Sequence, residues 1–494
     1  MAGRTAWVLG DQLSHENPAL EGVDRVLLVE SRATLCGRRF HRQKLHLVLS
    51  TMRHFAAELR GRGIEVDHRS APTLREGLEA HVRDHAPDSI GLLEPSSVGG
   101  RRRLGALPGV ELVRGSLFVV HPDEFRDWAE GRRRMVMEDF YRWQRGRLGV
   151  LMDGSEPAGG QWNLDRENRR PPPRDRRPPA VPELVEDEID FEVRRDLDRL
   201  APPCFGKDAP RQWPATAAEA GDALERFLAE RLADFGPWQD AMLHGERWMW
   251  HARLSSSLNL GLLSPLDCVA RAEAAYRAGE ASLASVEGFV RQLIGWREWV
   301  WGTYWLWQER WPHDNALGAD VGLPEVFWGG ATEMNCVGDA IAGLRETSYA
   351  HHIERLMLFG NLMLLLGVRP EEALEWFHVA FIDGYEWVMA PNVVGMALHA
   401  DGGRMMTKPY AASGGYVDRM SDHCRGCRYD PKKRTGEDAC PFTTLYWDFL
   451  ARHRDRFAQN RRMSPILGNL DRMEPGELDE IRARARGLRA DFSA

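Results

Sequence analysis

The sequence predicts an α/β N-terminal domain with a doubly wound parallel sheet, followed by an all-α C-terminal domain. Two observations predict this. Short β-branched runs alternate with helical stretches over residues 1 to about 120, and nearly every segment from about residue 216 onward has helical periodicity. A chain of 494 residues is also too long for one hydrophobic core, so two or three domains are expected.

The N-terminal part predicts strands at residues 6–10, 25–30, 64–70, 89–95 and 110–119. Between the second and third, residues 44–63 carry apolar side chains at three-and-four spacing and stop at glycines, which indicates a helix. No G-x-G-x-x-G follows the first strand; the first turn reads GDQLS instead. The alternation therefore predicts a doubly wound domain without a dinucleotide fingerprint.

The remaining chain divides at a proline- and arginine-rich stretch, residues 167–182, which suits neither a helix nor a central strand. Beyond it we expect helices over residues 216–236, 267–280, 285–307, 349–367 and 369–388, with Thr216 as a cap and Pro370 at a helix start. The predicted domains are residues 1–125, an interdomain linker at 126–215, and a helical domain at 216–494.

Composition excludes several classes of protein. With 43% hydrophobic and 28% charged residues the chain is an ordinary globular protein, not a disordered one. The net charge of -8 means that any nucleic-acid contact must come from local basic clusters, at residues 101–105, 131–135, 145–149, 167–177 and 431–436. The apolar run 356–368 is too short to span a membrane, and no signal peptide is recognised. Seven cysteines favour a reducing cytoplasm, where we expect the protein to be located.

Three of those cysteines are closely spaced. Cys424 and Cys427 form C-x-x-C, and Cys440 precedes Pro441. Zinc needs a fourth ligand, either His423, which is sequentially too close for easy tetrahedral geometry, or Cys336. An iron–sulfur cluster needs four thiolates and tolerates a distant fourth. Spacing alone leaves zinc and iron–sulfur equally open, whereas a disulfide is disfavoured in a cytoplasmic chain.

Longer motifs carry a resemblance. They are LGDQLS (9–14), STMRHFAAELR (50–60), GGQWNLDRENR (159–169), ASVEGFVRQLIGWRE (284–298), YAHHIERLM (349–357), KPYAASGGY (408–416), the cysteine segment 419–442 and YWDFLARHRDR (446–456). With them the chain resembles the bacterial iron–sulfur group of the cryptochrome/photolyase family over essentially its whole length. The resemblance implies a 4Fe–4S cluster on Cys336, Cys424, Cys427 and Cys440.

The resemblance also implies a U-shaped FAD in the helical domain. Ser255, Ser256 and Ser257, with backbone N–H groups at a helix start, suit a pyrophosphate. Arg355 and Asp383 match the pair that flanks the isoalloxazine ring. The remaining cofactor residues implied in the helical domain are Gln292, Trp296, Arg297 and Met389.

Two positions depart from the family pattern. Met389 stands where iron–sulfur relatives usually have Glu and ordinary photolyases have Asn, facing flavin N5. A methionine offers no strong donor and takes up no proton, which puts the usual redox tuning of the flavin in doubt. Gly415 replaces the Asn of relatives.

For catalysis the resemblance points to His351 and His352, with Tyr410 in the same pocket. Consecutive helical residues point about 100 degrees apart, so one His lines a cavity and the other braces it. Paired His here marks photolyases of pyrimidine (6-4) photoproducts, in which an imidazolium protonates the lesion while an electron passes from photoexcited reduced FAD and later returns. Without the resemblance, a structural His pair is the better interpretation.

Two other sets of residues are implied. Trp328 and Trp376, out of 18 tryptophans, match positions that relay electrons to oxidised flavin, and Phe377 stands where relatives often have Tyr. At the carboxyl ends of the predicted strands, Asp11, Gln12 and Glu30 are the polar candidates for a 6,7-dimethyl-8-ribityllumazine antenna, with strand-end capping as the alternative role.

The sequence thus predicts a monomeric (6-4) photolyase, a lyase that acts on UV-damaged DNA and not at a membrane. A cryptochrome photoreceptor without repair activity is the first alternative, which Met389 favours and the His pair opposes. A cyclobutane pyrimidine dimer photolyase is the second alternative. It is less favoured, because the lesion pocket of such enzymes usually lacks the second His.

Overall fold

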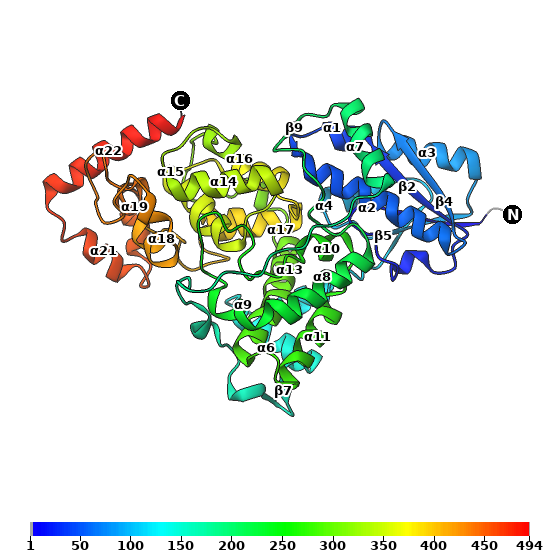
Figure 1. The fold of residues 1–494 in the computed structure, drawn as a ribbon, viewed down its shortest axis with the longest axis horizontal. Coiled ribbons are helices and arrows are strands. Elements are labelled where there is room, and N and C mark those ends of the chain that lie inside the picture. The colour runs from blue at the N-terminus through cyan, green and yellow to red at the C-terminus, as the bar shows by residue number, and fades with distance from the viewer. Residues whose placement is uncertain (1–2, 494) are drawn as a thin grey trace.

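The computed structural model describes residues 3–493, which form an α/β region at the N-terminal end and a larger helical region (Figure 1). The α/β region carries one parallel sheet of five strands in the order β4-β2-β1-β5-β6. Its strands are β1 (Arg4–Val8), β2 (Arg25–Ser31), β4 (Glu65–Ala71), β5 (Ser89–Leu93) and β6 (Val110–Val113). The order reverses at β1, as in a doubly wound fold, and the predicted fold class is confirmed.

Alternate residues of the strands are buried on opposite faces of the sheet. Ala6 and Val8 share a core with helix α2 (Arg42–Gly61), whereas Trp7 and Leu27 pack with Leu78 of α3 (Leu74–His85) on the other face. Burial on both faces explains why the central strands β1, β2 and β5 read as continuous apolar runs, whereas the outer strands β4 and β6 are more polar and more exposed.

The last predicted strand is too long, since residues 110–119 form a strand only as far as Val113. Beyond that point the chain leaves the sheet, and its backbone N–H groups form hydrogen bonds outside the sheet. The N–H groups of Val119 and Val120 both donate to a carboxylate oxygen of Glu298, at 2.8 and 2.9 Å, in the helical region. A buried carboxylate therefore takes over the donors that a longer strand would have paired.

Residues 126–215, predicted as a linker, contain two ordered helices, α6 (Met137–Leu148) and α7 (Glu188–Leu200). Helix α7 packs on α2, and β9 (Cys204–Phe205) pairs with β3 (Phe40–His41), so these two elements are attached to the α/β region (Figure 1). Helix α6 instead packs on residues Arg291–Arg297 of the helical region. Residues 171–187 have neither helix nor strand, in line with their prolines. The remaining α-helices and strands before residue 216 are α1 (Arg32–Cys36), α4 (Val98–Leu104), α5 (Pro122–Ala129), β7 (Met152–Asp153) and β8 (Glu156–Pro157).

The helical region begins as predicted. The Thr216 side chain accepts the N–H of Glu219 at 3.2 Å, and Pro370 opens its helix. The α-helices are α8 (Ala217–Glu230), α9 (Leu232–Trp238), α10 (Ser255–Leu260), α11 (Pro265–Arg277), α12 (Leu283–Val290), α13 (Glu298–Leu306), α14 (Asn335–Thr347), α15 (Asn361–Leu366), α16 (Pro370–Ala380), α17 (Glu386–Met389), α18 (Gly414–Met420), α19 (Pro441–Arg452), α20 (Arg454–Ala458), α21 (Ser464–Leu470) and α22 (Pro475–Ser493). Within residues 3–493, no helix is both long and apolar enough to cross a membrane.

Three helices of this region contain π-helical segments: η4 (Arg291–Arg297), η7 (Glu354–Gly360) and η8 (Ala390–Ala397). Segment η4 joins α12 to α13, η7 continues into α15, and η8 follows α17. π-Helical turns are rare and occur frequently at functional sites. All three border the cavity described next.

Candidate functional site

A cavity of about 670 Å³ lies in the helical region. Each π-helical segment contributes to its wall, for example Gln292 from η4, Arg355 from η7 and Met396 from η8. We call it the central cavity. Its lining ranges along the chain from Arg169 to Met420, so only the tertiary fold assembles it.

Most of the predicted flavin and lesion residues line the central cavity. These are Ser255, Gln292, Trp296, Arg297, His352, Arg355, Asp383, Met389 and Tyr410. The other three, His351, Ser256 and Ser257, are buried and are not among its lining residues. The hydroxyl oxygens of Ser256 and Ser257 have no hydrogen-bond partner within the chain.

Two arginines bring charge to the cavity wall. Arg355 pairs with Asp383, and both Arg355 and burial act on the pKa of Asp383: burial raises it, but the guanidinium lowers it below its usual value. Arg297 is held by Glu298, with Nη1 2.7 Å from Oε1, and lies over the ring of Phe118 at 4.2 Å. Cations fixed in this way suit an anionic ligand.

The two consecutive histidines, His351 and His352, have different surroundings. His352 lines the cavity and is exposed within it, and partial desolvation by the surrounding protein together with the Arg355 charge lowers the pKa of His352 to about 4. His351 is fully buried behind it, stacked on His251 with ring centroids 4.7 Å apart, and neither of its ring nitrogens has a hydrogen-bond partner. Its nearest carboxylate oxygen belongs to Glu354, 3.7 Å away.

Glu354 is itself unusual. Its Oε2 accepts the backbone N–H of His351 at 3.2 Å, and the side chain is buried. Burial raises the pKa of Glu354 to about 8. The carboxyl group is therefore largely protonated at neutral pH.

Several lining residues had not been predicted, among them Arg253, His251, Tyr349, Trp387, Tyr416 and Asp240. Arg253 has a backbone φ of 58°, rare for a residue with a side chain, and its guanidinium lies 4.0 Å from the Trp248 ring. Its Nε has no partner within the chain. The sequence signal was its place in HARLSSS, directly before the predicted serines. Burial raises the pKa of Asp240 to about 6.

The fold brings the distant Cys336 near the other three predicted metal-ligating cysteines, Cys424, Cys427 and Cys440. Cys336 lies in the first turn of α14, and Cys440 caps α19. Cys424 lies within the 3₁₀ turn His423–Gly426, which packs on α14, and Cys427 follows that turn directly. Burial raises the pKa of the Cys336 thiol, and the other three sulfurs raise it further. Burial likewise raises the pKa of Cys424 to about 12 and of Cys440 to about 11. A cationic centre would remove this cost by binding thiolates.

The predicted electron relay is less continuous. Trp376 is fully buried, and its indole N–H donates to the Phe327 carbonyl at 3.0 Å. Trp328 lies under the Arg39 guanidinium at 4.8 Å and against the Phe205 ring. No ring contact joins Trp328 to Trp376 among the described residues.

At the sheet edge the predicted antenna residues are engaged within the chain. Gln12 is fully buried and donates to the Leu93 carbonyl at 2.9 Å. Glu30 binds Arg53 and His68; burial opposes its ionisation, but these partners lower the pKa of Glu30 to about 2. Asp11 accepts a hydrogen bond from Ser96, and burial raises its pKa.

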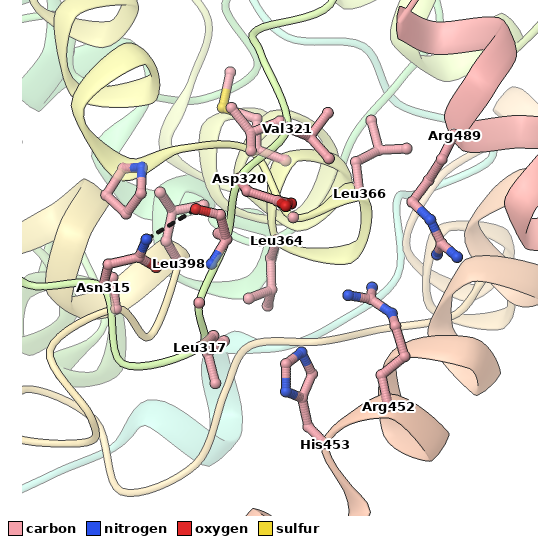
Figure 2. A pocket seen from close by; sticks show the side chains of 17 residues that line it. Asn315, Leu317, Asp320, Val321, Leu364, Leu366, Leu398, Arg452, His453 and Arg489 are labelled. Atoms are coloured by element: carbon pink, nitrogen blue, oxygen red, sulfur yellow. Dashed lines mark hydrogen bonds between the residues drawn. The ribbon is translucent and has the colours of Figure 1, made fainter.

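A second cavity, of about 230 Å³, contains none of the predicted site residues. Figure 2 shows Asp320 on one side and Arg452, His453 and Arg489 on the other. Both arginines bind Asp448, with Arg452 Nε 2.8 Å from its Oδ2.

Fold and site together define a two-domain protein in which a helical domain encloses a deep, cation-lined ligand cavity next to a doubly wound α/β domain. Residues 6–213 match a family model described as deoxyribodipyrimidine photo-lyase-related protein. A (6-4) photolyase of Agrobacterium fabrum is 42% identical over 493 residues, which are 97% of this chain and 97% of that protein. This chain belongs to the cryptochrome/photolyase family.

Of two further similarities, one covers a shorter part of the chain and the other has a lower sequence identity. An uncharacterized protein of Acanthamoeba polyphaga mimivirus, R855, is 36% identical over 101 residues, 20% of this chain and 75% of that protein. The crystal structure of a bacterial class III photolyase from Agrobacterium tumefaciens superposes with a TM-score of 0.60 at 15% identity, covering 100% of this chain and 98% of the other. The latter similarity concerns the fold.

Proposed function

We propose that this protein is a light-dependent lyase that repairs pyrimidine (6-4) photoproducts in UV-damaged DNA, with FAD in the central cavity. The observation that carries the proposal is the shared wall of that cavity, where His352 lies beside the Arg355–Asp383 pair. A proton donor and an anchored cation are the two groups that electron-driven repair requires in one place. The 42% identical relative named as a (6-4) photolyase supports the same activity.

The cavity residues fit FAD. The unpartnered Nε atoms of Arg253 and Arg297, with Ser255 between them in the chain, suit the pyrophosphate. Arg355 and Asp383 would flank the isoalloxazine, and Gln292 and Trp296 would complete the wall. When bound, FAD supplies the photoexcited electron that the lesion accepts.

The residues at the cavity mouth suit a damaged, flipped-out nucleotide. Arg169 and Arg419 are exposed there and would contact backbone phosphates, so affinity should fall steeply with salt. Tyr410 and Tyr416 offer aromatic surface for the extruded bases.

His352 would hold the proton that the lesion needs. Its low pKa keeps the imidazole neutral in the ligand-free cavity, while a DNA phosphate brought nearby would stabilise the imidazolium. His351, stacked on His251 and next to the protonated Glu354, would brace His352 from behind. Protonation of the lesion then depends on DNA binding.

For Cys336, Cys424, Cys427 and Cys440 we propose a 4Fe–4S cluster. Support comes from the pKa of the Cys336 thiol, which burial and the sulfurs of the other three cysteines raise, and from the position of Cys336 and Cys440 at helix N-termini, where the peptide dipoles favour an anionic cluster. The same free thiols fit a reducing, cytoplasmic compartment.

We also propose a ribityllumazine antenna at the carboxyl ends of the strands. Asp11 and Glu30 are the side chains that would meet its ring or ribityl hydroxyls, and Gln12 would hold the first turn in shape through its bond to Leu93. Arg53 and His68 keep the Glu30 carboxylate charged for such contacts.

A blue-light photoreceptor without repair activity is the second candidate, favoured by Met389 at the cavity wall. The deciding experiment illuminates chemically reduced protein with oligonucleotides bearing either a (6-4) photoproduct or a cyclobutane dimer, and measures restored thymines. Restoration from the (6-4) substrate alone is expected. Restoration from neither, with flavin still photoreduced, would assign the protein to the photoreceptors.

A further inference from the structure

We propose that His244, Asp339 and His423 bind a divalent transition-metal ion of the Zn²⁺ type, at a site separate from the four cysteines. We call these three residues the histidine–aspartate cluster. Their candidate ligand atoms, one from each side chain, all lie within 4.8 Å of one another. The site requires neither FAD nor DNA, so its failure and that of the proposed function are distinguishable.

The histidine–aspartate cluster joins three segments that are distant in sequence. His244 lies between α9 and α10, Asp339 lies in α14, and His423 opens the 3₁₀ turn of the cysteine segment. The His244 N–H donates to Asp422 Oδ1 at 2.7 Å, and the following N–H, of Gly245, donates to Asp339 Oδ2 at 2.8 Å. The backbone of His244 is therefore anchored on both other segments, although its side chain is 55% exposed.

The ring of His423 has unsatisfied bonding capacity. Its side chain is buried, with 1% exposed, and neither ring nitrogen has a hydrogen-bond partner among the described residues. An imidazole offers one N–H donor and one lone pair, and leaving both unpaired in the interior is unfavourable. The ring packs edge-on against that of His244, with centroids 5.5 Å apart. A metal ion shared by the two rings would use one lone pair from each.

Asp339 supplies the carboxylate ligand. Its Oδ2 lies 3.6 Å from His244 Nδ1, too far for a hydrogen bond. Two ligand atoms held tetrahedrally by one zinc ion lie roughly 3.4 Å apart, which is close to this separation. The other oxygen, Oδ1, accepts a hydrogen bond from Arg247 Nη1 at 2.8 Å, which orients the carboxylate as the outer partners of metal ligands do. The Asp339 and Asp422 carboxylates outnumber the Arg247 guanidinium, so the local charge favours a cation.

The ligand types select the class of metal ion. Two imidazole nitrogens and one carboxylate oxygen suit Zn²⁺ and divalent iron. Magnesium and calcium ions prefer oxygen ligands, so the two imidazoles disfavour both. Because the His244 side chain is exposed, water can supply a further ligand.

Another group of histidines with a carboxylate, Asp67, His81 and His85, lacks these features. Asp67 Oδ2 already lies 2.6 Å from His81 Nδ1 and 2.6 Å from Arg69 Nε. The second ring nitrogen of His81 lies 3.0 Å from the Thr5 hydroxyl. Its ligand atoms are thus engaged within the chain, whereas those of His423 are not.

The histidine–aspartate cluster shares two segments with the cysteines. In α14, Asp339 follows Cys336 by about one helical turn, and His423 directly precedes Cys424. A bound ion would cross-link these two segments to the chain that precedes α10. We therefore expect it to have a structural role, in which it holds Cys336 and Cys424 in position.

The test uses full-length protein that retains its iron, treated with a mild chelator and then titrated with ZnCl₂. After gel filtration, elemental analysis should find a single additional zinc ion per polypeptide, with the iron content unchanged. Constant iron separates this site from the four cysteines, which zinc enters only by displacing iron. No gain of zinc overturns the proposal.

His244→Ala removes the exposed ligand and should weaken zinc binding by about 100-fold or more, since even a residue that only orients a ligand contributes about 10–100-fold. The matched control is His85→Ala, from the other histidine group, which should keep the zinc affinity within about twofold. Unchanged affinity in His244→Ala, or an equal loss in His85→Ala, overturns the proposal.

X-ray absorption at the zinc edge covers a His244→Ala variant that fails to fold, because it needs only the titrated wild-type protein. The spectrum should show nitrogen and oxygen ligands at about 2.0–2.2 Å and no sulfur at about 2.3 Å. Sulfur ligands would assign the zinc to the cysteines and reject the histidine–aspartate cluster as its site.

Discussion

Arg355 and Asp383 face each other as a two-point ion pair, with Nη1 2.8 Å from Oδ1 and Nη2 3.2 Å from Oδ2. The guanidinium also lies 4.2 Å from the Phe381 ring, and its Nε donates to the Ala350 carbonyl at 2.6 Å. These contacts leave the cation one fixed position beside the cavity. The pair ties η7 to the turn before α17, and so joins two walls of the site.

Replacing Asp383 by Asn should sharply reduce flavin binding. Removing one partner of a buried pair leaves Arg355 uncompensated, at a cost of about 3–5 kcal/mol. Purified Asp383→Asn should therefore carry little flavin, measured as blue absorbance per polypeptide. Asp471→Asn, which breaks the exposed pair with Arg454, should change stability by less than about 1 kcal/mol and retain flavin. Full flavin content in Asp383→Asn would show that flavin binding does not depend on the Arg355–Asp383 pair.

Replacing His352 by Ala should lower repair of the (6-4) photoproduct by about 100-fold or more, because the lesion loses its proton donor. The assay is restored thymine under light with pre-reduced protein. Flavin content should be normal, and His453→Ala, in the other cavity, should repair at the wild-type rate. An NMR titration of ligand-free protein should give a His352 midpoint at about 4 that rises when DNA binds. Repair surviving in His352→Ala contradicts the assigned role.

Glu354 should make stability depend on pH. Its pKa of about 8 in the folded protein exceeds its ordinary value of 4.5, so the folded state holds the proton more tightly. This contribution is fully present below pH 4.5 and is lost as pH rises toward 8, by an amount on the order of a few kcal/mol.

Glu354→Gln should therefore flatten the decline in denaturant-measured stability between pH 4.5 and 8, since glutamine does not titrate there. The amide oxygen can still accept the His351 N–H. Glu371→Gln, at an exposed carboxylate, should leave the pH profile unchanged. A wild-type profile in Glu354→Gln would show that another group causes the dependence.

Cys336→Ala should lose most of the bound iron, because one of four thiolates is removed. Iron per polypeptide and the visible absorbance of the cluster are the measurements. Cys268→Ala, also fully buried but in α11, should retain both. Zinc in place of iron in the wild-type protein would overturn the cluster assignment while leaving the ligand set intact.

Parts of the site were visible in the sequence because local chemistry encodes them. The C-x-x-C pair, the cap at Thr216 and the helical period of 285–307 each depend on residues within a few positions of one another. His251 was missed because nothing local distinguishes a residue that lines a cavity from one that packs in a core, whereas Arg253 had only its place directly before the predicted serines as a signal. The extended strand predicted over 110–119 failed for a related reason, since Glu298, far along the chain, captures its N–H groups.

By itself the sequence determined the alternation of strands and helices, the change to an all-helical second half, and the set of chemically reactive residues. Only the tertiary structure decided which of them share a site: His352 and not His351 faces the cavity, and Ser255 and not Ser256 lines it. Gln12 instead donates a hydrogen bond to the backbone carbonyl of Leu93. The physical reason is the distance along the chain over which the interactions act. Periodicity and capping act within a turn or two of chain, whereas the cavity arises from packing among segments between residues 169 and 420.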